Sequence, residues 1–256
     1  MIIAVLQARL SSSRLPGKVL KPILDQPMLA LQIERIKRSQ LIDQLVVATS
    51  TSPEDEQISK LCQEIEVVSF RGSLDDVLER VYQAAKPYSP TYLVRLTGDC
   101  PLCDPELIDQ VIQFHVDGNY DYSSNCLIPT YPDGLDVEIC RFQCLEIAEK
   151  EATLPSHREH VTPFINQQPD RFKLGNYQHD QDLSYLRWTV DEPADFELVR
   201  QIYTNLYPQN PSFNMRDILD WLYQHPEWQT HNSKYERNEG FTKSLLADQE
   251  FLVQTN

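Results

Sequence analysis

Short apolar runs alternate with amphipathic stretches along the first hundred residues of the chain. Each apolar run is long enough for one buried strand, and the runs cover 2–6, 45–49, 66–70 and 92–96. The stretches between them place apolar residues at helical spacing, and they cover 27–38, 53–63 and 74–82. Alternation of strand and helix is typical of a parallel sheet. We therefore predict an α/β fold with a mostly parallel central sheet flanked by helices.

The second half of the chain continues this pattern and then changes character. It predicts helices over 104–115, 142–153, 193–203 and 215–224 and strands over 135–139 and 186–190. The last stretch is polar, with an amphipathic piece over 234–241. We predict one nucleotidyltransferase domain over 1–228 and a C-terminal tail over 229–256, which packs on that domain or on a second subunit of a homodimer.

Composition excludes several classes of protein. The 256 residues include 23 basic and 38 acidic ones, and the net charge of −15 argues against general nucleic-acid binding. No run of 18 apolar residues occurs, and Met1 leads directly into a strand, so we expect no membrane span and no signal peptide. We expect a cytoplasmic protein whose six cysteines are free thiols.

A basic loop follows the first predicted strand. It carries Arg9, Arg14 and Lys18 among hydroxyl-bearing residues, and Gly17 follows a proline. A cationic loop at the end of a buried strand is a common place to hold phosphates in an open α/β sheet, although many basic clusters are only solvated loops. Acidic residues outnumber basic ones in the chain as a whole, so a local concentration of cations is not background. The chain has only seven glycines, so Gly17 indicates a required backbone conformation. Both observations favour the phosphate site here.

Two aspartates follow predicted strands in the same way. Asp99 follows the strand over 92–96, and Asp191 follows the strand over 186–190. Magnesium in proteins is usually held by one or two carboxylates together with substrate phosphates. The sequence therefore predicts a Mg²⁺ site formed by Asp99 and Asp191.

Other chemically active residues allow more than one interpretation. Gly72 and Ser73 open the helix over 74–82, either as a simple helix cap or as amides that face a ligand. Asp136 and Glu138 share one face of the strand over 135–139, either toward solvent or toward a pocket. The cysteine pair at 100 and 103 and the histidine pair at 157 and 160 lack the companion residues of a metal site, which favours structural roles.

Several motifs carry a resemblance to a known family. The chain resembles the sugar-activating cytidylyltransferases, which include the enzymes that make CMP-linked 3-deoxy-sugar acids, through QAR at 7–9 and SRLPGKVL at 13–20. It is similar to the spore-coat polysaccharide biosynthesis protein F type within that superfamily through LTGDCPL at 96–102, YPDGLDVE at 131–138, VDEP at 190–193 and RNEG at 237–240. The resemblance spans nearly the whole chain and implies the Rossmann-like nucleotide-diphospho-sugar transferase fold.

This resemblance implies a Mg²⁺-dependent reaction for surface polysaccharide biosynthesis. CTP and the hydroxyl of a sugar, such as a nonulosonic or another acidic sugar, would give a CMP-sugar and pyrophosphate. The catalytic residues implied are Arg9, Arg14, Lys18 and Asp99. The nucleotide-binding residues implied are Leu6, Gln7, Ala8, Arg9, Ser13, Lys18, Gly72, Ser73, Thr97 and Gly98. The sugar-binding residues implied are Asn125, Asp133, Asp136 and Glu138, and the metal ligands are Asp99 and Asp191.

Two departures from the family pattern leave alternatives open. Cys100 stands where the 3-deoxy-sugar-acid enzymes carry glutamate, and the carboxylate of an acidic sugar could meet Arg95, Arg158 or Arg187. The same fold also serves glycosyltransferases that consume a nucleotide sugar, and it could serve a non-catalytic nucleotide-binding subunit. The sequence names no acceptor sugar.

Overall fold

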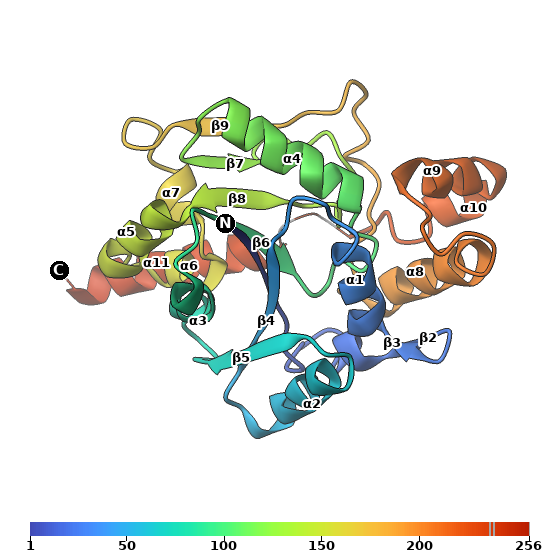
Figure 1. Cartoon of the computed structure of the whole chain (residues 1–256), viewed down its shortest axis with the longest axis horizontal. Coiled ribbons are helices and arrows are strands. Elements are labelled where there is room, and N and C mark those ends of the chain that lie inside the picture. The colour runs from blue at the N-terminus through green and yellow to red at the C-terminus, as the bar shows by residue number, and fades with distance from the viewer. Residues whose placement is uncertain (236, 238, 256) are drawn as a thin grey trace.

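The computed structural model describes residues 1–235, 237 and 239–255 of the 256-residue chain. Within these residues, seven strands form one mixed sheet in the order β5-β4-β1-β6-β8-β7-β9 (Figure 1). Their bounds are β1 Ile2–Gln7, β4 Gln44–Ser50, β5 Val68–Gly72, β6 Tyr92–Thr97, β7 Tyr122–Ser124, β8 Glu138–Arg141 and β9 Leu174–Asn176. A separate small hairpin pairs β2 Pro22–Ile23 with β3 Gln26–Pro27.

The sheet is mostly parallel, as its sequence predicts. β1 pairs in parallel with β4 and β6, and β4 pairs in parallel with β5. β8 runs antiparallel to both β6 and β7, and the loop over 125–137 that joins β7 to β8 contains no crossover helix. The predicted α/β class with a mostly parallel central sheet is confirmed.

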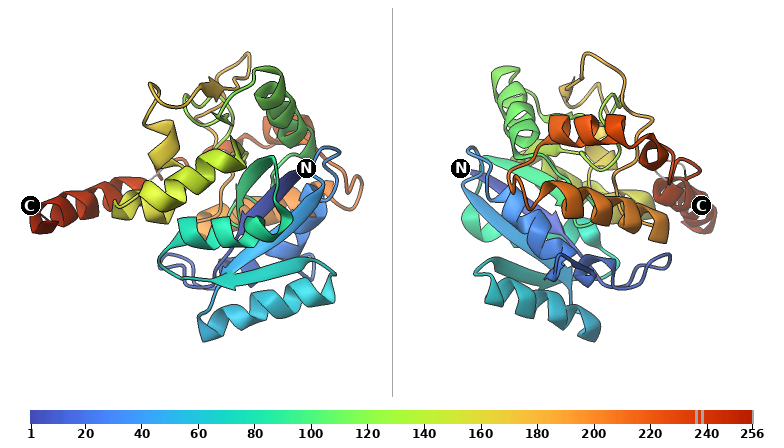
Figure 2. Two further views of the ribbon diagram at one scale, coloured as in Figure 1. Left: turned by 60° about the vertical axis from the view of Figure 1, so that its left-hand side comes forward. Right: turned by 90° about the vertical axis from the view of Figure 1, so that its right-hand side faces the viewer.

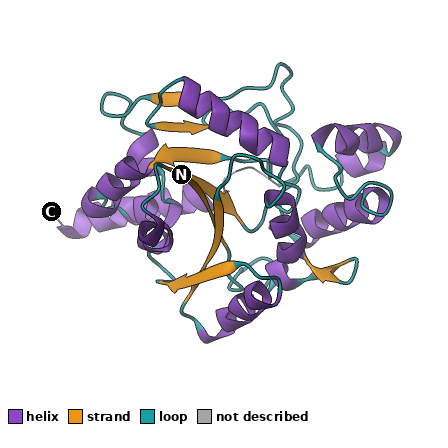
Figure 3. Ribbon diagram, viewed as in Figure 1, coloured by secondary structure: helices purple, strands orange, loops and turns teal. Residues whose placement is uncertain are grey.

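Helices cover both faces of the sheet, so the strands are buried from two sides (Figure 3). One face packs against α1 Met28–Ile36, α2 Glu56–Glu64, α4 Pro105–Asp117, α8 Pro193–Leu206 and α9 Met215–Gln224. The other face packs against α3 Val77–Ala85 and α5 Phe142–Glu151. Two short helices follow α5 on this side, α6 Pro155–His160 and α7 Pro163–Asn166. Side chains of β1 alternate between these layers: Ala4 and Leu6 enter the first, Ile3 and Val5 the second.

The C-terminal segment packs against the main body before its last helix, since Asn232 is buried and its side-chain amide donates to the Arg187 carbonyl oxygen and the Asp195 carboxylate. After α10 Pro226–Gln229, the helix α11 Glu239–Thr255 crosses α6 and then projects from the molecule (Figure 2). The predicted tail over 229–256 includes positions 236, 238 and 256, which lie outside the described residues. The division into a domain over 1–228 and a tail stays a prediction.

The prediction of a strand over 186–190 is wrong. The segment forms only an isolated bridge between Asp133 and Arg187. The amides of Trp188 and Thr189 both donate to the carbonyl oxygen of Asp133, and the amide of Val190 donates to that of Asp99. These bonds tie the segment to two loops instead of to a neighbouring strand.

Two predicted boundaries also shift, for local reasons. The helix predicted over 74–82 is α3 and begins at Val77, because the Asp76 side chain caps it by accepting from the amide of Glu79. The strand predicted over 135–139 is β8 and begins only at Glu138. Asp136 therefore lies in the loop that precedes the strand.

Gly134 permits the close approach of this loop to residues 188 and 189. Its φ is +107°, and a side-chain carbon there would lie 2.6 Å from the Trp188 carbonyl carbon and even closer to the Thr189 amide. Gly134→Ala is therefore expected to lower the free energy of unfolding by about 2–4 kcal/mol. Urea unfolding measures this loss. Gly240→Ala is the control, because nothing lies within 4 Å of that position, and an equal loss in both variants would contradict the interpretation.

Candidate functional site

A cavity of about 810 Å³ opens at the carboxyl ends of β1 and β6. This edge of an open α/β sheet is where such folds usually bind ligands. Residues from the loop after β1, from α3, from the loop before β8 and from α6 and α11 line it. Of the residues that the sequence singled out, those that line it are Gln7, Ala8, Arg9, Ser13, Arg14, Lys18, Arg95, Thr97, Gly98, Asp99, Cys100, Asp133, Asp136, Glu138, His160, Arg187 and Asp191.

Lys18 lies where the two predicted metal ligands meet. Its Nζ donates to the Asp191 carboxylate at 2.8 Å and to the Val190 carbonyl oxygen at 2.8 Å, and it lies 3.4 Å from the Asp99 carboxylate. Arg14 reaches the other oxygen of Asp191 at 3.0 Å. The loop after β1 and two distant aspartates thus form one charged cluster, called here the Lys18 cluster: Arg14, Lys18, Asp99 and Asp191.

The backbone holds Lys18 and Asp191 in place. Gly17 adopts a left-handed φ of +68° just before Lys18 begins a short 3₁₀ helix, Lys18–Leu20. Asp191 lies ahead of α8, and its amide donates to the buried Asp195 carboxylate at 2.9 Å. Gly17 therefore has the special backbone shape that its place beside a proline indicates.

Opposite charges shift the pKa values of the cluster in a consistent direction. Burial by itself would lower the pKa of Lys18, but the Asp99 and Asp191 carboxylates outweigh burial and raise it. Burial would raise the pKa of Asp99, but the Lys18 ammonium and nearby hydrogen bonds lower it below its usual value. Lys18 is therefore positive and Asp99 negative at neutral pH.

The donor set of the cluster fits a divalent cation that also binds phosphate. Asp99 and Asp191 already share one positive charge, the Lys18 ammonium, and both carboxylates are partly exposed to the cavity. Among residues 1–235, 237 and 239–255, no group of three or more His, Cys, Asp or Glu side chains is arranged to hold a metal. Two carboxylates alone suit Mg²⁺ only when phosphate oxygens and water complete its shell.

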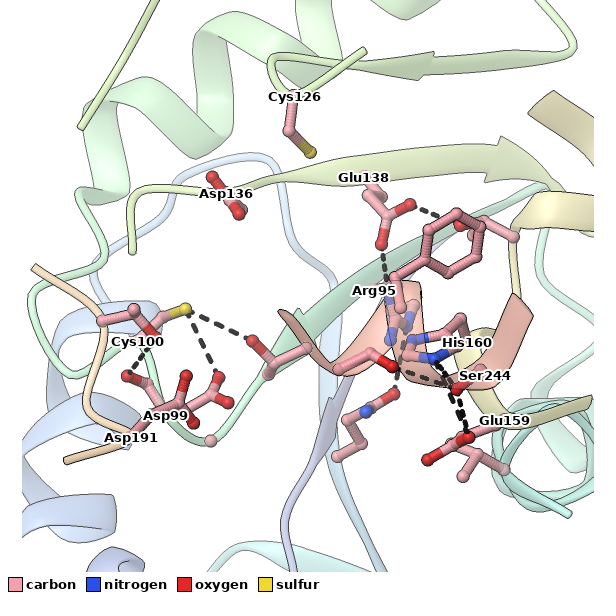
Figure 4. Close-up of a pocket in the computed structure, with 18 of the residues that line it drawn as sticks. Arg95, Asp99, Cys100, Cys126, Asp136, Glu138, Glu159, His160, Asp191 and Ser244 are labelled. Carbon is pink, nitrogen blue, oxygen red and sulfur yellow. Dashed lines mark hydrogen bonds and ion pairs between the residues drawn. The ribbon is translucent and has the colours of Figure 1, made fainter. Parts of the chain in front are cut away.

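A second group of acids lies farther along the cavity (Figure 4). Glu138 is bound by three donors, the Arg95 guanidinium and the hydroxyls of Tyr122 and Thr162. Asp136 faces the cavity near Cys100 and Asp99 in Figure 4 and pairs with the Arg237 guanidinium. Burial raises the pKa of Asp136 to about 7, although Arg237 opposes that rise.

The C-terminal segment supplies part of this wall. The Ser244 hydroxyl of α11 shares a hydrogen bond of 2.8 Å with His160 Nε2. It also donates to the Glu159 carboxylate at 2.7 Å (Figure 4). Phe241 packs edge-on against the His160 ring, with ring centroids 5.1 Å apart. Residues 240, 241, 244 and 247 line the cavity. Helix α11 therefore contacts α6 beside the cavity.

Four residues expected at the site do not line the cavity. Asn125 is fully buried, and its side-chain amide bonds the backbone of Leu135 and Val137 at 2.8 Å each, so it shapes the loop before β8. Ser73 accepts from the amide of Asp76 at 3.0 Å, in the turn that precedes α3. Gly72 faces the side chains of Phe70 and Arg80. Leu6 is also fully buried in the core, and its side chain does not line the cavity.

The three arginines considered for an acidic sugar all have carboxylate partners. Arg95 pairs with Glu138, Arg158 with Asp76, and Arg187 with Asp133, Asp191 and Asp195. Residues that the sequence did not single out also line the wall, among them Arg80 on α3. Arg80 lies three residues after buried Val77, so a charge on the apolar stripe of the helix was the available signal.

Comparison with known proteins agrees with the geometry. A family model described as cytidylyltransferase matches residues 3–225. An uncharacterized protein of Methanocaldococcus jannaschii is 38% identical over 234 residues, which cover 91% of this chain and 94% of that protein. The spore coat polysaccharide biosynthesis protein SpsF of Bacillus subtilis is 30% identical over 233 residues, 88% of this chain and 95% of that protein.

Solved structures share the fold. A cytidylyltransferase from Leptospira borgpetersenii serovar Hardjo-bovis superposes with a TM-score of 0.86 at 30% identity, over 92% of this chain and 99% of that one. Two more distant structures show the fold alone. CMP:2-keto-3-deoxy-manno-octonic acid synthetase complexed with CTP has a TM-score of 0.63 at 17% identity over 79% of this chain and 98% of that one. A Mycobacterium tuberculosis protein in complex with manganese has a TM-score of 0.55 at 14% identity over 78% and 98%.

These findings confirm the resemblance that the motifs indicated. The matched residues include the loop after β1, Asp99 and Asp191, and so the whole Lys18 cluster. The model match covers most of the chain, and the Bacillus subtilis relative covers nearly its full length. The chain therefore belongs to the cytidylyltransferase family.

Proposed function

We propose that this protein transfers CMP from CTP to a hydroxyl of a sugar and releases pyrophosphate, in the biosynthesis of a surface polysaccharide. The observation that carries the proposal is the Lys18 cluster, where cations of the loop after β1 meet Asp99 and Asp191 in one cavity. The names of two similar proteins, the spore coat polysaccharide protein and the CTP-bound sugar-acid synthetase, support the reaction class and the pathway.

The cations of the loop after β1 bind the triphosphate in this proposal. Arg9, Arg14 and Lys18 neutralise the β- and γ-phosphates, where charge builds as the leaving group departs. The acceptor oxygen forms a bond to the α-phosphorus, and the bond from that phosphorus to the β-phosphate oxygen breaks. Asp136 takes the hydroxyl proton, since a pKa of about 7 suits a base near neutral pH.

Asp99 and Asp191 hold Mg²⁺ in the same proposal. A divalent ion supplies charge compensation at the α-phosphate. Manganese in one protein of similar fold supports the use of a divalent ion. None of the helices in the described part of the chain combines the length and apolar character that crossing a membrane requires. Cytoplasmic placement and a homodimer are proposals that follow from the sequence.

Pyrophosphate release tests the reaction. The protein is mixed with Mg²⁺, each nucleoside triphosphate in turn, and a panel of neutral, amino and sialic-acid-like sugars. Release that needs both CTP and one sugar is the expected result. Tighter binding of a CDP-sugar than of CTP, without pyrophosphate release, would instead favour a glycosyltransferase. CTP binding without turnover on any sugar would favour a non-catalytic subunit.

Arg14→Ala is expected to lower kcat/KM at least about tenfold, because a charge-assisted contact to the triphosphate is lost. The Arg14 side chain is 29% exposed and pairs with Asp191 in the cavity, so its removal changes the site more than the fold. Steady-state kinetics with CTP as the varied substrate measures the loss. Arg216→Ala, an exposed arginine in the first turn of α9, is the control and should keep full activity. Equal kinetics in both variants would remove Arg14 from the phosphate site.

A further inference from the structure

Arg80 is a buried cation in the cavity wall without a carboxylate partner. It lies on α3, it is 2% exposed, and it lines the cavity. One terminal nitrogen donates to the carbonyl oxygen of Ser73 at 2.7 Å, and its Nε has no hydrogen-bond partner. Among the ion pairs of the described residues, none includes Arg80. A buried charge without a counter-ion is costly unless a ligand compensates it.

The backbone before α3 fixes the direction of this side chain. A side-chain carbon at Gly72 would lie 2.9 Å from Cγ of Arg80, so the glycine leaves the space that Arg80 fills. One terminal nitrogen of Arg80 donates to the carbonyl oxygens of both Ser73 and Leu74. Gly72 and Ser73 therefore act on the cavity through Arg80, although neither residue lines it.

Arg9 brings a second positive charge to the same space. Burial, and then the charge of Arg9, lower the pKa of Arg80 to about 10, which leaves it positive at neutral pH. Asp55 and Glu79 oppose this effect only in part. The Asp55 carboxylate is already occupied, since it accepts from the amide of Leu10 and from Ser50. Two neighbouring cations without a carboxylate between them favour an oxyanion.

We propose that Arg80 and Arg9 form an oxyanion-binding subsite that takes a phosphoryl oxygen of CTP. The inference rests on the proposed function and adds a residue to it. A phosphate fits better than the carboxylate of an acceptor sugar for two reasons. Arg9 opens the loop whose three serines, Ser11–Ser13, line the same cavity. The acceptor side holds Asp136 and Glu138, which would repel an acid.

Calorimetric titration of Arg80→Gln tests the subsite without turnover. The probes are CTP, inorganic tripolyphosphate and cytidine, each titrated into the full-length protein. We expect Kd for CTP and for tripolyphosphate to rise about 10- to 100-fold, and Kd for cytidine to stay unchanged. Arg9→Gln should give a similar loss, and the double variant should lose less than the two losses combined, because both residues share one anion.

Arg158→Gln is the matched control. Arg158 pairs with Asp76 beside α3 and does not line the cavity, so its loss should leave tripolyphosphate binding unchanged. Arg80→Lys keeps the charge and serves if the glutamine variant does not fold. Its affinity for tripolyphosphate should lie between those of the unaltered protein and of Arg80→Gln. Unchanged tripolyphosphate binding in folded Arg80→Gln overturns the proposal, and so does a raised sugar KM with unchanged CTP affinity. Weakened tripolyphosphate binding supports it even if no sugar is ever cytidylylated.

Discussion

Replacing Lys18 with methionine is expected to lower kcat/KM by about 100- to 1000-fold. The ammonium is the point at which Asp99, Asp191 and the Val190 carbonyl oxygen converge, and its side chain is only 10% exposed. A preorganised donor at the place where charge develops is worth this much in other enzymes. Methionine keeps most of the length of the side chain and removes the charge. Steady-state kinetics with CTP and the active sugar measures the change.

Lys21→Met is the control for Lys18→Met. Lys21 ends the same loop, and its ammonium lies over the Phe196 ring at 5.7 Å, away from the cavity lining. It should keep nearly full activity. An equal loss in the two variants would show that the loop, and not the Lys18 charge, is responsible.

The same substitution gives a test of the cation site that does not need a substrate. Without Lys18, two partly buried carboxylates lose their shared counter-charge, which should cost about 1–3 kcal/mol of unfolding free energy. Added Mg²⁺ should restore more stability to Lys18→Met than it adds to the unaltered protein, because a divalent cation can replace the ammonium. Thermal unfolding with and without Mg²⁺ measures this gain. No extra gain in the variant would argue against a cation held by Asp99 and Asp191.

The meeting of Lys18, Asp99 and Asp191 could be expected from the sequence because strand ends are easy to recognise. In a parallel sheet, residues that follow β1 and β6 must come out at the same edge. Asp191 was placed correctly for another reason, since its predicted strand does not exist. Asp191 lies just ahead of α8, where its amide donates to Asp195 of that helix, and the amide of Val190 ties the segment to the carbonyl oxygen of Asp99.

Residues on connecting loops were harder to place, because period and spacing do not report which way a loop turns. Asn125 occurs in a polar stretch, yet its amide is consumed by the backbone of Leu135 and Val137. Arg237 lies 101 residues from its partner Asp136, and only the folded chain brings them together. Arg80 is buried because of how α3 packs in the folded chain. The helical pattern of the sequence shows only that a charged residue lies on the apolar face of this helix.

Asp136→Asn is expected to lower kcat about 100-fold, because the proposed proton acceptor is lost. The same role predicts how the unaltered protein responds to pH. Its kcat/KM should fall as pH drops below about 7, the pKa to which burial raises the Asp136 carboxyl, because the protonated acid cannot accept a proton. The pH–rate profile from pH 5.5 to 9 measures both effects. A variant that keeps full kcat would remove Asp136 from the chemistry.

Arg237→Gln should move that limb of the profile to higher pH. Besides burial, the groups that act on Asp136 are Arg237, which lowers its pKa, and the carboxylates of Asp133, Glu138 and Asp99, which raise it. Loss of the guanidinium leaves burial and the neighbouring carboxylates, which all raise the pKa of Asp136, so more of the acid is protonated at pH 7. Activity at pH 7 should fall about tenfold or more and recover toward pH 9. Arg237→Lys keeps the charge and should restore the original limb. An equal loss at every pH would mean that Arg237 acts only by holding the C-terminal segment against the cavity. It would contradict the prediction that Arg237 lowers the pKa of Asp136 during the reaction.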